Sequence, residues 1–355
     1  MKQTSWMKVA ILLSLFALCS CREIKVQHRD DVAIYNHTLA TILVEYASAV
    51  YLSDLTDLVN WTCSRCGDLT EGFEMIELVV DIKRCLQGFV GVAPNLNAIV
   101  IAFRGTQGNS IQNWIEDLFW KQLDLHYPDM PDAMVHHGFY SAYHDTTIQP
   151  KILEAIERAK GLYGNIDIMV TGHSMGGAMA AFCGLDLTVN YKIQNVQVVT
   201  FGQPRIGNTA FASCYSKLVP NTIRVTNKHD IVPHLPPYYP RLTQKTYHHF
   251  PREVWLTEEG LDTISYPVEK VCDDTGEDPN CSRSVLGSSI WDHLEYYGVE
   301  LGDRTEEGSC RIVMDPRVAT HKVEDPEGNF VLYRDNPSSI EKMNTESRTP
   351  SKGVS

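Results

Sequence analysis

Apolar residues near the N-terminal third of the chain recur three and four positions apart, between residues 35 and 58. This spacing is typical of an amphipathic α-helix that packs one face against other elements. The residues that carry it are Leu39, Ile42, Leu43, Tyr46, Ala47 and Val50. The pattern predicts one long helix, or a pair of helices, that covers one face of a sheet.

Short apolar and β-branched runs predict strands further along the chain. These runs lie at residues 74–80, 85–92, 97–103, 196–201, 222–226 and 253–256. The run A-I-V-I-A-F that ends at Phe103 is apolar throughout, as expected for a central strand buried on both faces. A helical pattern at residues 150–163 lies between these strands. We therefore expect a sheet covered by helices on both faces.

The stretch around Ser174 combines an apolar strand, a sharp turn and a helix rich in small residues. The turn reads Gly172-His173-Ser174-Met175-Gly176, which matches the G-x-S-x-G nucleophile elbow of α/β-hydrolases. A bare G-x-S-x-G pattern occurs by chance in roughly one chain in ten of this length. The preceding strand and the following helix are what the mechanism requires, so they favour a catalytic serine over coincidence.

A nucleophilic serine needs a histidine base, and the base needs a carboxylate that orients it. In this fold the acid follows the serine in the chain and the histidine comes last. Asp230 comes just after the strand at 222–226, whereas Asp186 lies within a helical pattern and is less suitable. His293 lies beyond the strand at 253–256 and is the best candidate base, with His248 as the alternative.

Two backbone N–H groups are expected to hold the oxyanion that forms during acyl transfer. One belongs to the residue after the nucleophile, Met175, and the other to a loop after an earlier strand. Thr106, in F-R-G-T after the strand at 97–103, is at the required place, and its hydroxyl offers a further donor. The alternative is that this segment is an ordinary turn at the end of a strand.

Residues 108–125 contain an apolar stripe at helical spacing. Its members are Ile111, Trp114, Ile115, Leu118 and Phe119. Because this segment follows the oxyanion loop, it is expected to lie at the mouth of the site. We interpret it as a lid that covers the serine when closed and exposes aromatic surface to a lipid interface when open. The alternative is a plain helix packed on the core.

The charge and the N-terminus limit the possible partners and the location. The formal net charge of the 355-residue chain is −13, which argues against nucleic-acid binding and leaves apolar contact as the means of meeting lipid. Lys2 and Lys8 precede a short apolar run that ends in small residues, which predicts a secretory signal peptide over residues 1–21. An uncleaved anchor is the alternative, and no later stretch is long enough to be a transmembrane helix.

Cysteine usage agrees with an oxidising compartment, where disulfides are expected first. The cysteines after the predicted signal peptide are Cys63, Cys66, Cys85, Cys183, Cys214, Cys272, Cys281 and Cys310. Cys272 and Cys281 flank a polar loop and are expected to pair, while Cys183 and Cys214 lie in helical patterns and are interpreted as buried free thiols. No metal site is expected, because the Cys63–Cys66 pair lacks a second ligand pair.

Other polar residues are assigned more modest roles. His136 and His137 have no ligand partners at metal spacing and are interpreted as structural. The glycosylation sequons are at Asn36, Asn60 and Asn280, and each would be used only if exposed.

Several motifs together make the chain similar to the class 3, fungal-type lipase family, and most of all to its plant members. They are F-R-G-T at Phe103, N-W-I-E-D-L at Asn113, V-H-H-G-F-Y-S-A-Y at Val135, G-H-S-M-G-G-A at Gly172, T-F-G-Q-P-R-I-G-N at Thr200, R-V-T-N-K-H-D-I-V-P-H-L-P-P at Arg224 and D-H-L-E-Y-Y at Asp292. The resemblance implies an α/β-hydrolase fold, with a mostly parallel central sheet, helices on both faces and a short helical lid. It implies a Ser174–Asp230–His293 triad and oxyanion donors at Thr106 and Met175.

The resemblance also implies a Cys63–Cys66 bridge, a Cys272–Cys281 bridge and a bridge from Cys310 to the N-terminal part, through Cys85. The hydrolase domain would span residues 22–310. Two regions depart from the family: a long acidic loop at 257–283, and a polar tail at 311–355 that we expect to be largely disordered. Phe330 to Tyr333 is the one apolar cluster of this tail and is too short to fold alone.

These inferences predict a secreted serine carboxylester hydrolase without cofactors, acting on lipid or other esters, most readily a lipase for triacylglycerol or related glycerolipids. A feruloyl-type esterase and a phospholipase or galactolipase A1 share the same machinery and remain alternatives. A catalytically silent, lipase-like scaffold that binds partners is an alternative of another class. The sequence does not indicate the oligomeric state.

Overall fold

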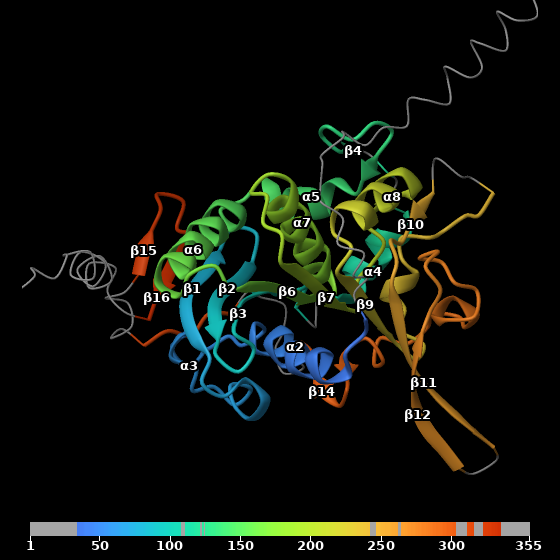
Figure 1. Cartoon of the computed structure of the whole chain (residues 1–355), viewed down its shortest axis with the longest axis horizontal. Helices are drawn as coiled ribbons and strands as arrows, with labels where there is room; N and C mark the ends of the chain where they lie inside the picture. Colours follow the sequence, from blue (N-terminus) through green and yellow to red (C-terminus); the bar gives the residue numbers. More distant parts are fainter. Residues whose placement is uncertain are drawn as a thin grey trace, which may run out of the picture.

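The computed structural model describes residues 34–107, 111–120, 123, 125–241, 246–261, 264–302, 311–315 and 322–334. Its main feature is a ten-stranded sheet with helices on both faces, as Figure 1 shows. The strand order is β12-β11-β9-β7-β6-β3-β2-β1-β16-β15. The predicted signal peptide at residues 1–21 lies outside the described residues.

Five neighbouring strands of this sheet are parallel, and they are the ones that carry the site. They are β3 (Ala98–Phe103), β6 (Asp167–His173), β7 (Val196–Phe201), β9 (Thr222–Asn227) and β11 (Glu253–Leu261). Antiparallel strands flank them: β1 (Glu74–Asp81), β2 (Leu86–Ala93), β15 (Lys322–Glu324) and β16 (Phe330–Tyr333) on one side, and β12 (Ile264–Val271) on the other. The five parallel central strands agree with the predicted central sheet.

Both faces of the central strands are buried, because alternate side chains point to opposite sides. In β3, Ile99, Ile101 and Phe103 belong to one apolar cluster, whereas Val100 and Ala102 belong to the other. The first cluster includes side chains of α4 (Ile111–Trp120), α5 (His137–His144), α6 (Ile148–Tyr163), α7 (Met175–Val189) and α8 (Thr209–Leu218). The second includes α2 (His37–Ala49) and α3 (Leu55–Asn60), which lie below the sheet in Figure 1.

The N-terminal apolar pattern forms a pair of helices and not one long helix. Helix α2 ends near Val50, and α3 begins after Asp54, whose side chain accepts hydrogen bonds from the N–H groups of Thr56 and Asp57. This capping stabilises the start of a second helix, because the N–H groups in the first turn of a helix have no partner inside the helix.

Short elements complete the fold. A small sheet contains β4 (Leu125–His126), β5 (Met134–Val135), β8 (Gly207–Asn208) and β10 (Tyr247–His248). The strands β13 (Glu295–Tyr296) and β14 (Val299–Glu300) form a hairpin after the predicted base. Single-turn helices are η1 (Asp68–Thr70), η2 (Val232–His234) and η3 (Ser282–Ser284).

Two regions differ from the sequence-based expectation. The acidic stretch after Leu256 is not simply a loop, because β11 continues to Leu261 and pairs with β12 in a hairpin that extends away from the body in Figure 1. The strand at 253–256 is therefore not the last one of the sheet.

The second difference concerns the tail, which was expected to be largely disordered. Phe330 to Tyr333 form β16, which pairs with β1 over four residues and also with β15. A four-residue apolar segment cannot fold alone, but the exposed edge of β1 supplies the missing ladder partner. Among the residues that the structure describes, no helix has the length and apolarity needed to cross a membrane.

Candidate active site

Ser174 occupies the sharp turn between strand β6 and helix α7. Its φ of 58° and ψ of −128° lie in a region that residues with a Cβ adopt only under strain. The flanking glycines permit the turn. A Cβ on Gly172 would lie 2.4 Å from the backbone of Gly176, and a Cβ on Gly176 would lie 2.1 Å from the carbonyl oxygen of Phe103. The elbow therefore packs closely against the end of β3.

The two predicted oxyanion residues lie near each other beside this turn. Strands β3 and β6 are parallel, with Phe103 opposite Gly172, so the loop after β3 runs alongside the elbow. The hydroxyl oxygen of Thr106 lies 4.0 Å from the sulfur of Met175. Met175 is the first residue of α7, where a backbone N–H has no partner inside the helix and the helix dipole is positive. This end of the sheet is suited to hold a negative charge.

Asp230 lies directly beyond β9 and binds three groups. Its Oδ1 accepts a hydrogen bond from the N–H of Val232 at 2.8 Å, and its Oδ2 accepts one from Nδ1 of His293 at 2.9 Å. The hydroxyl of Tyr296 donates to the same Oδ2 at 2.5 Å. Because a carboxylate only accepts, the proton of the neutral imidazole is on Nδ1. Nε2 of His293 then carries the lone pair that a general base uses.

The segment that carries His293 is bound to the loop that carries Asp230. Asp230 and Ser289 form a parallel β-bridge, and the N–H of Ile231 donates to the carbonyl of Ser289. Gly202, just past β7, gives the pair room. Its φ is 57°, and a Cβ there would lie 2.8 Å from Nδ1 of His293 and 2.9 Å from Oδ2 of Asp230.

The hydroxyl of Ser174 and Nε2 of His293 are both buried, and neither has a hydrogen-bond partner. The ring of His293 lies beside the ring of His173, the residue before the serine, at a centroid distance of 4.3 Å. An unpaired buried polar group costs about 1–3 kcal/mol, so such groups are rare unless they have a role in binding or chemistry. The arrangement leaves a hydroxyl and a basic nitrogen uncommitted in one buried region.

Residues 111–120 of the predicted lid segment form helix α4, whereas 108–110, 121–122 and 124 lie outside the described residues. The apolar stripe of α4 is divided between core and surface. Ile111, Ile115 and Leu118 are buried in the core cluster, and the ring of Trp114 lies 6.0 Å from that of Phe139. The side chain of Phe119 is 46% exposed. Ser174 itself is fully buried. Substrate access therefore requires a movement, and α4 remains the predicted moving element.

The other candidate residues lie elsewhere. His248, the alternative base, belongs to β10 of the small sheet, and its Nδ1 is 2.6 Å from the carbonyl oxygen of His249. His136 caps α5, because its Nδ1 accepts a hydrogen bond from the N–H of Phe139. Asp186, inside α7, accepts hydrogen bonds from Gln149, Tyr143 and Asn190. Of the two acids and two bases considered for the triad, Asp230 and His293 are the pair joined by a hydrogen bond in the part of the chain that the structure describes.

Four residues in or beside the site were not predicted: Gly202, Tyr296, His173 and Tyr51, whose hydroxyl lies 2.8 Å from Nδ1 of His173. Gly202 follows a predicted strand, and a glycine at that place is the kind of signal that indicates close packing. Tyr296 follows His293 by three residues, within the D-H-L-E-Y-Y motif, and no role was assigned to it. Tyr51 lies at the end of the N-terminal helical pattern, far from the other residues in sequence. Nothing in that pattern distinguishes its hydroxyl from that of any other tyrosine.

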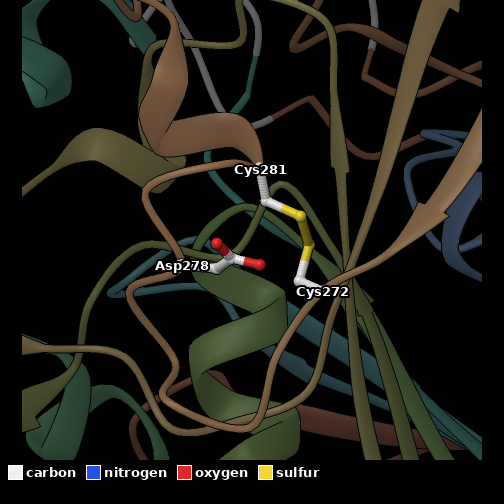
Figure 2. A group of neighbouring side chains, drawn as sticks. All are labelled: Cys272, Asp278 and Cys281. Atoms are coloured by element: carbon white, nitrogen blue, oxygen red, sulfur yellow. A yellow bond between two sulfur atoms is a disulfide. The ribbon is translucent and has the colours of Figure 1, made fainter.

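A cluster of Cys272, Asp278 and Cys281 has its ligand-type atoms within 4.8 Å of one another, as metal ligands do. Figure 2 shows, however, that the two sulfurs are joined to each other in a disulfide. A sulfur in a disulfide offers no thiolate to a metal. The carboxylate of Asp278 instead accepts hydrogen bonds from the N–H groups of Asp273 and Asn280. The cluster therefore closes a loop and is not a metal centre.

The remaining cysteines and the sequons can also be placed. Cys63 is bonded to Cys66. Cys85 is disulfide-bonded as well, whereas Cys310, its expected partner, lies outside the described residues. Cys214 is disulfide-bonded too, so its interpretation as a free thiol was wrong, because a helical pattern does not reveal a distant partner. Cys183 is buried and free.

The three sequon asparagines, Asn36, Asn60 and Asn280, are all exposed. The side chain of Asn36 also caps α2. Exposure is necessary for glycosylation, so all three remain predicted sites.

Comparison with known proteins identifies the family. A family model described as Lipase (class 3) matches residues 100–239. A lipase of Caenorhabditis elegans is 32% identical over 319 residues, which cover 81% of this chain and 86% of that protein. The chain belongs to the class 3 lipase family. The predicted membership of the class 3 lipase family is thereby confirmed.

Two further similarities support this membership. The class 3 lipase chain is 32% identical to a lipase of Rhizomucor miehei over 247 residues, which cover 68% of the chain but only 63% of that relative. A solved structure titled as a triacylglycerol lipase with a serine-protease triad is 31% identical, with a TM-score of 0.64. The match covers 74% of this chain and 95% of that one. The predicted α/β-hydrolase fold is confirmed by this similarity and by the strand order.

Proposed function

We propose that this class 3 lipase is a secreted serine carboxylester hydrolase that cleaves acyl esters of triacylglycerol or related glycerolipids. The observation that carries the proposal is the buried hydrogen bond between Asp230 and His293, with the unpaired Nε2 of the ring in the same buried region as the elbow serine. Structural packing alone does not account for a strained serine and an unpaired imidazole nitrogen in one place.

The reaction uses the residues as follows. Nε2 of His293 accepts the proton of the Ser174 hydroxyl while the serine oxygen attacks the ester carbonyl. The N–H groups of Thr106 and Met175 donate to the oxyanion. His293 then gives its proton to the departing alcohol, which leaves an acyl-serine. Water attacks this acyl group with the same base, and the acid is released. Asp230 keeps the ring oriented and stabilises its charged form.

The lipid character of the substrate is supported by the surface of the chain. Helix α4 carries an exposed Phe119 and a partly buried Trp114. With a net charge of −13, the chain gains little from electrostatic attraction to anionic lipid, so contact with an interface depends on apolar side chains. The similar solved structure is that of a triacylglycerol lipase, which agrees with this substrate class.

Labelling with a fluorophosphonate tests the chemistry. We expect the purified chain to be labelled on Ser174, and the Ser174→Ala variant to be unlabelled and to lose at least about 10⁴-fold in kcat. A folded wild-type chain that neither labels nor hydrolyses any ester would contradict the proposal. It would favour the partner-binding scaffold instead.

A product assay tests the substrate class. The panel contains emulsified triacylglycerol, phosphatidylcholine, a galactolipid and methyl ferulate, each at matched ester concentration. We expect the highest turnover on triacylglycerol. Preferred release from the phospholipid, the galactolipid or the ferulate would keep the hydrolase and replace the substrate by that class.

We also propose that residues 1–21 direct the chain out of the cell. The hydrolase domain, predicted at residues 22–310, extends to Tyr333 in this proposal, because β15 and β16 belong to its sheet. The proposal is supported by the basic, apolar and small-residue order of the first segment and by the disulfides Cys63–Cys66 and Cys272–Cys281. Expression of the full chain in a eukaryotic cell, with N-terminal sequencing of the medium, tests it. A mature protein beginning near Arg22 is expected, and retention in the cell with residue 1 intact would contradict it.

A further inference from the structure

A continuous series of buried hydrogen bonds connects the oxyanion loop to the backbone of His293, and the mechanism above does not use it. The N–H of Gly105 is 3.1 Å from the hydroxyl oxygen of Tyr51. That hydroxyl is 2.8 Å from Nδ1 of His173, and Nε2 of His173 is 2.8 Å from the carbonyl oxygen of His293. Tyr51, His173 and His293 are each at most 1% exposed.

The directions of these bonds follow from elementary chemistry. The carbonyl oxygen of His293 can only accept, so Nε2 of His173 carries a proton and donates it. In a neutral ring Nδ1 is then the acceptor, which makes the hydroxyl of Tyr51 the donor. The tyrosine oxygen accepts the N–H of Gly105 through a lone pair. One assignment therefore satisfies every group in the series.

The electrostatic surroundings agree with a neutral His173. Burial, together with the neighbouring His293, holds the pKa of His173 well below its ordinary value. Burial also raises the pKa of Tyr51, so its hydroxyl keeps the proton that it donates. His173 thus stays neutral and Tyr51 stays protonated near neutral pH, as the series requires.

The same assignment excludes two more direct roles. Tyr51 lies close to the elbow, since a Cβ on Gly105 would be 2.3 Å from its hydroxyl oxygen and 3.0 Å from Cβ of Ser174. Its proton is nevertheless committed to His173, so it is not available to an oxyanion. Both ring nitrogens of His173 are also occupied, so that ring cannot serve as a base in place of His293.

We propose that Tyr51 and His173 are positioning residues that hold the oxyanion loop, the elbow and the backbone of the base in one register. The inference rests on the proposed function, because it assigns these residues to the same reaction. Tyr51 belongs to the segment after α2, Gly105 follows β3 and His173 ends β6. The series therefore joins three separate elements around the reacting atoms.

The expected consequence is kinetic. A displacement of reacting groups by about 1 Å can cost about 10²-fold in rate, while binding of the ester outside the reacting centre is unaffected. Loss of the series should therefore lower kcat and leave KM nearly unchanged.

Three variants test the proposal, with kcat expressed per fluorophosphonate-reactive site so that only folded enzyme is counted. Tyr51→Phe removes both bonds of the hydroxyl and should lower kcat about tenfold or more, with KM within about twofold. His173→Gln places an amide nitrogen where Nε2 was and keeps the donation to His293. His173→Asn keeps only a group at the position of Nδ1. The glutamine variant should retain several times the kcat of the asparagine variant.

Tyr46→Phe is the matched control. Tyr46 is fully buried in α2, and its hydroxyl has no hydrogen-bond partner, so this variant should keep the wild-type kcat. A Tyr51→Phe variant that loses thermal stability but keeps the wild-type kcat would overturn the inference. If Tyr51→Phe does not fold, the two His173 variants decide, and equal kcat values for both would overturn it. An inactive wild-type chain would instead refute the proposed function.

Discussion

Gly202 shows how one residue sets the distance between a sheet and the groups that act above it. Its backbone has a positive φ, and its missing side chain leaves the space that Asp230 and His293 occupy. Any Cβ there would push on the hydrogen bond between the two. The glycine thus matters for geometry and not for chemistry.

The variant Gly202→Ala should therefore lose about 10²-fold or more in kcat, since the imidazole must shift. Its unfolding free energy should also fall by about 1 kcal/mol or more, because alanine at a positive φ is strained. Steady-state kinetics and urea unfolding measure the two effects.

Gly161→Ala is the control. Gly161 lies in helix α6 with open space where a Cβ would be, so its activity should be unchanged and its stability equal or higher. Wild-type activity of Gly202→Ala would contradict this account of the site.

At the scale of elements, the apolar stripe of α4 has a buried part and an exposed part. Its buried members hold the helix on the core, while Phe119 remains in water. Burying a large apolar side chain is worth about 1.5–3 kcal/mol, so an exposed one favours transfer to a lipid phase.

We therefore expect Phe119→Ala to lower activity on emulsified triacylglycerol by up to about tenfold, with little change on a dissolved short-chain ester. The ratio of the two rates is the measurement. Leu162→Ala, at a 38% exposed position on α6, is the control and should leave the ratio unchanged. An equal loss on both substrates would mean that α4 acts on folding or catalysis and not at an interface.

The loop closed by Cys272 and Cys281 is a second element with a defined task. This loop carries Glu277. The guanidinium of Arg205 donates to the two carboxylate oxygens of Glu277 at 2.6 and 2.9 Å. Arg205 also donates to the carbonyl oxygens of His234 and Pro236. The buried ion pair thus fixes the segment after the predicted acid.

Glu277→Ala should destabilise the fold by about 3–5 kcal/mol, because it leaves the buried guanidinium of Arg205 unpaired. Thermal or urea unfolding measures this loss. Asp274→Ala is a control from the same loop. Its side chain is 73% exposed and pairs with Arg252, so the variant should cost no more than about 1 kcal/mol. Similar costs for both variants would refute the special role of Glu277.

At the scale of the whole molecule, β16 and β15 extend the sheet beyond β1, and β1 carries a buried charged residue. Glu77 in β1 lies opposite Tyr333 in β16 and is fully buried. Its carboxylate is 2.9 Å from Nε of Arg158, whose guanidinium lies over the ring of Tyr333. Burial nevertheless outweighs this cation and raises the pKa of Glu77 to about 7.

This shift makes stability depend on pH in a defined direction. The raised pKa means that the folded chain holds the proton more tightly than the unfolded chain, whose value is 4.5. The contribution of the Glu77 carboxyl to stability is therefore fully present below pH 4.5 and is lost as the pH rises to about 7. The Glu77→Gln side chain cannot ionise. The unfolding free energy of this variant, relative to wild type, should therefore rise by about 2 kcal/mol when the pH is raised from 5 to 8. Urea unfolding at both pH values measures the gap, and a constant gap would contradict the assignment.

Much of this fold could be predicted because its elements are specified locally. The strands at 97–103 and 196–201, the helix at 150–163 and the elbow at Ser174 each have their pattern within a dozen residues, and the structure places them within two residues of the prediction. The order of the serine, acid and histidine along the chain was likewise readable, because the fold admits one order.

Other features depend on contacts between distant segments, which no local pattern contains. Only the tertiary structure decided that the imidazole at Asp230 belongs to His293 and not to His248. It also decided that Phe330 to Tyr333 pair with β1 and that Cys214 forms a disulfide. The sequence by itself determined the central strands, the helices around them, their order and the family. The tertiary structure decided which groups meet, because periodicity and turn chemistry act over a few residues, whereas these contacts join segments up to about 250 residues apart.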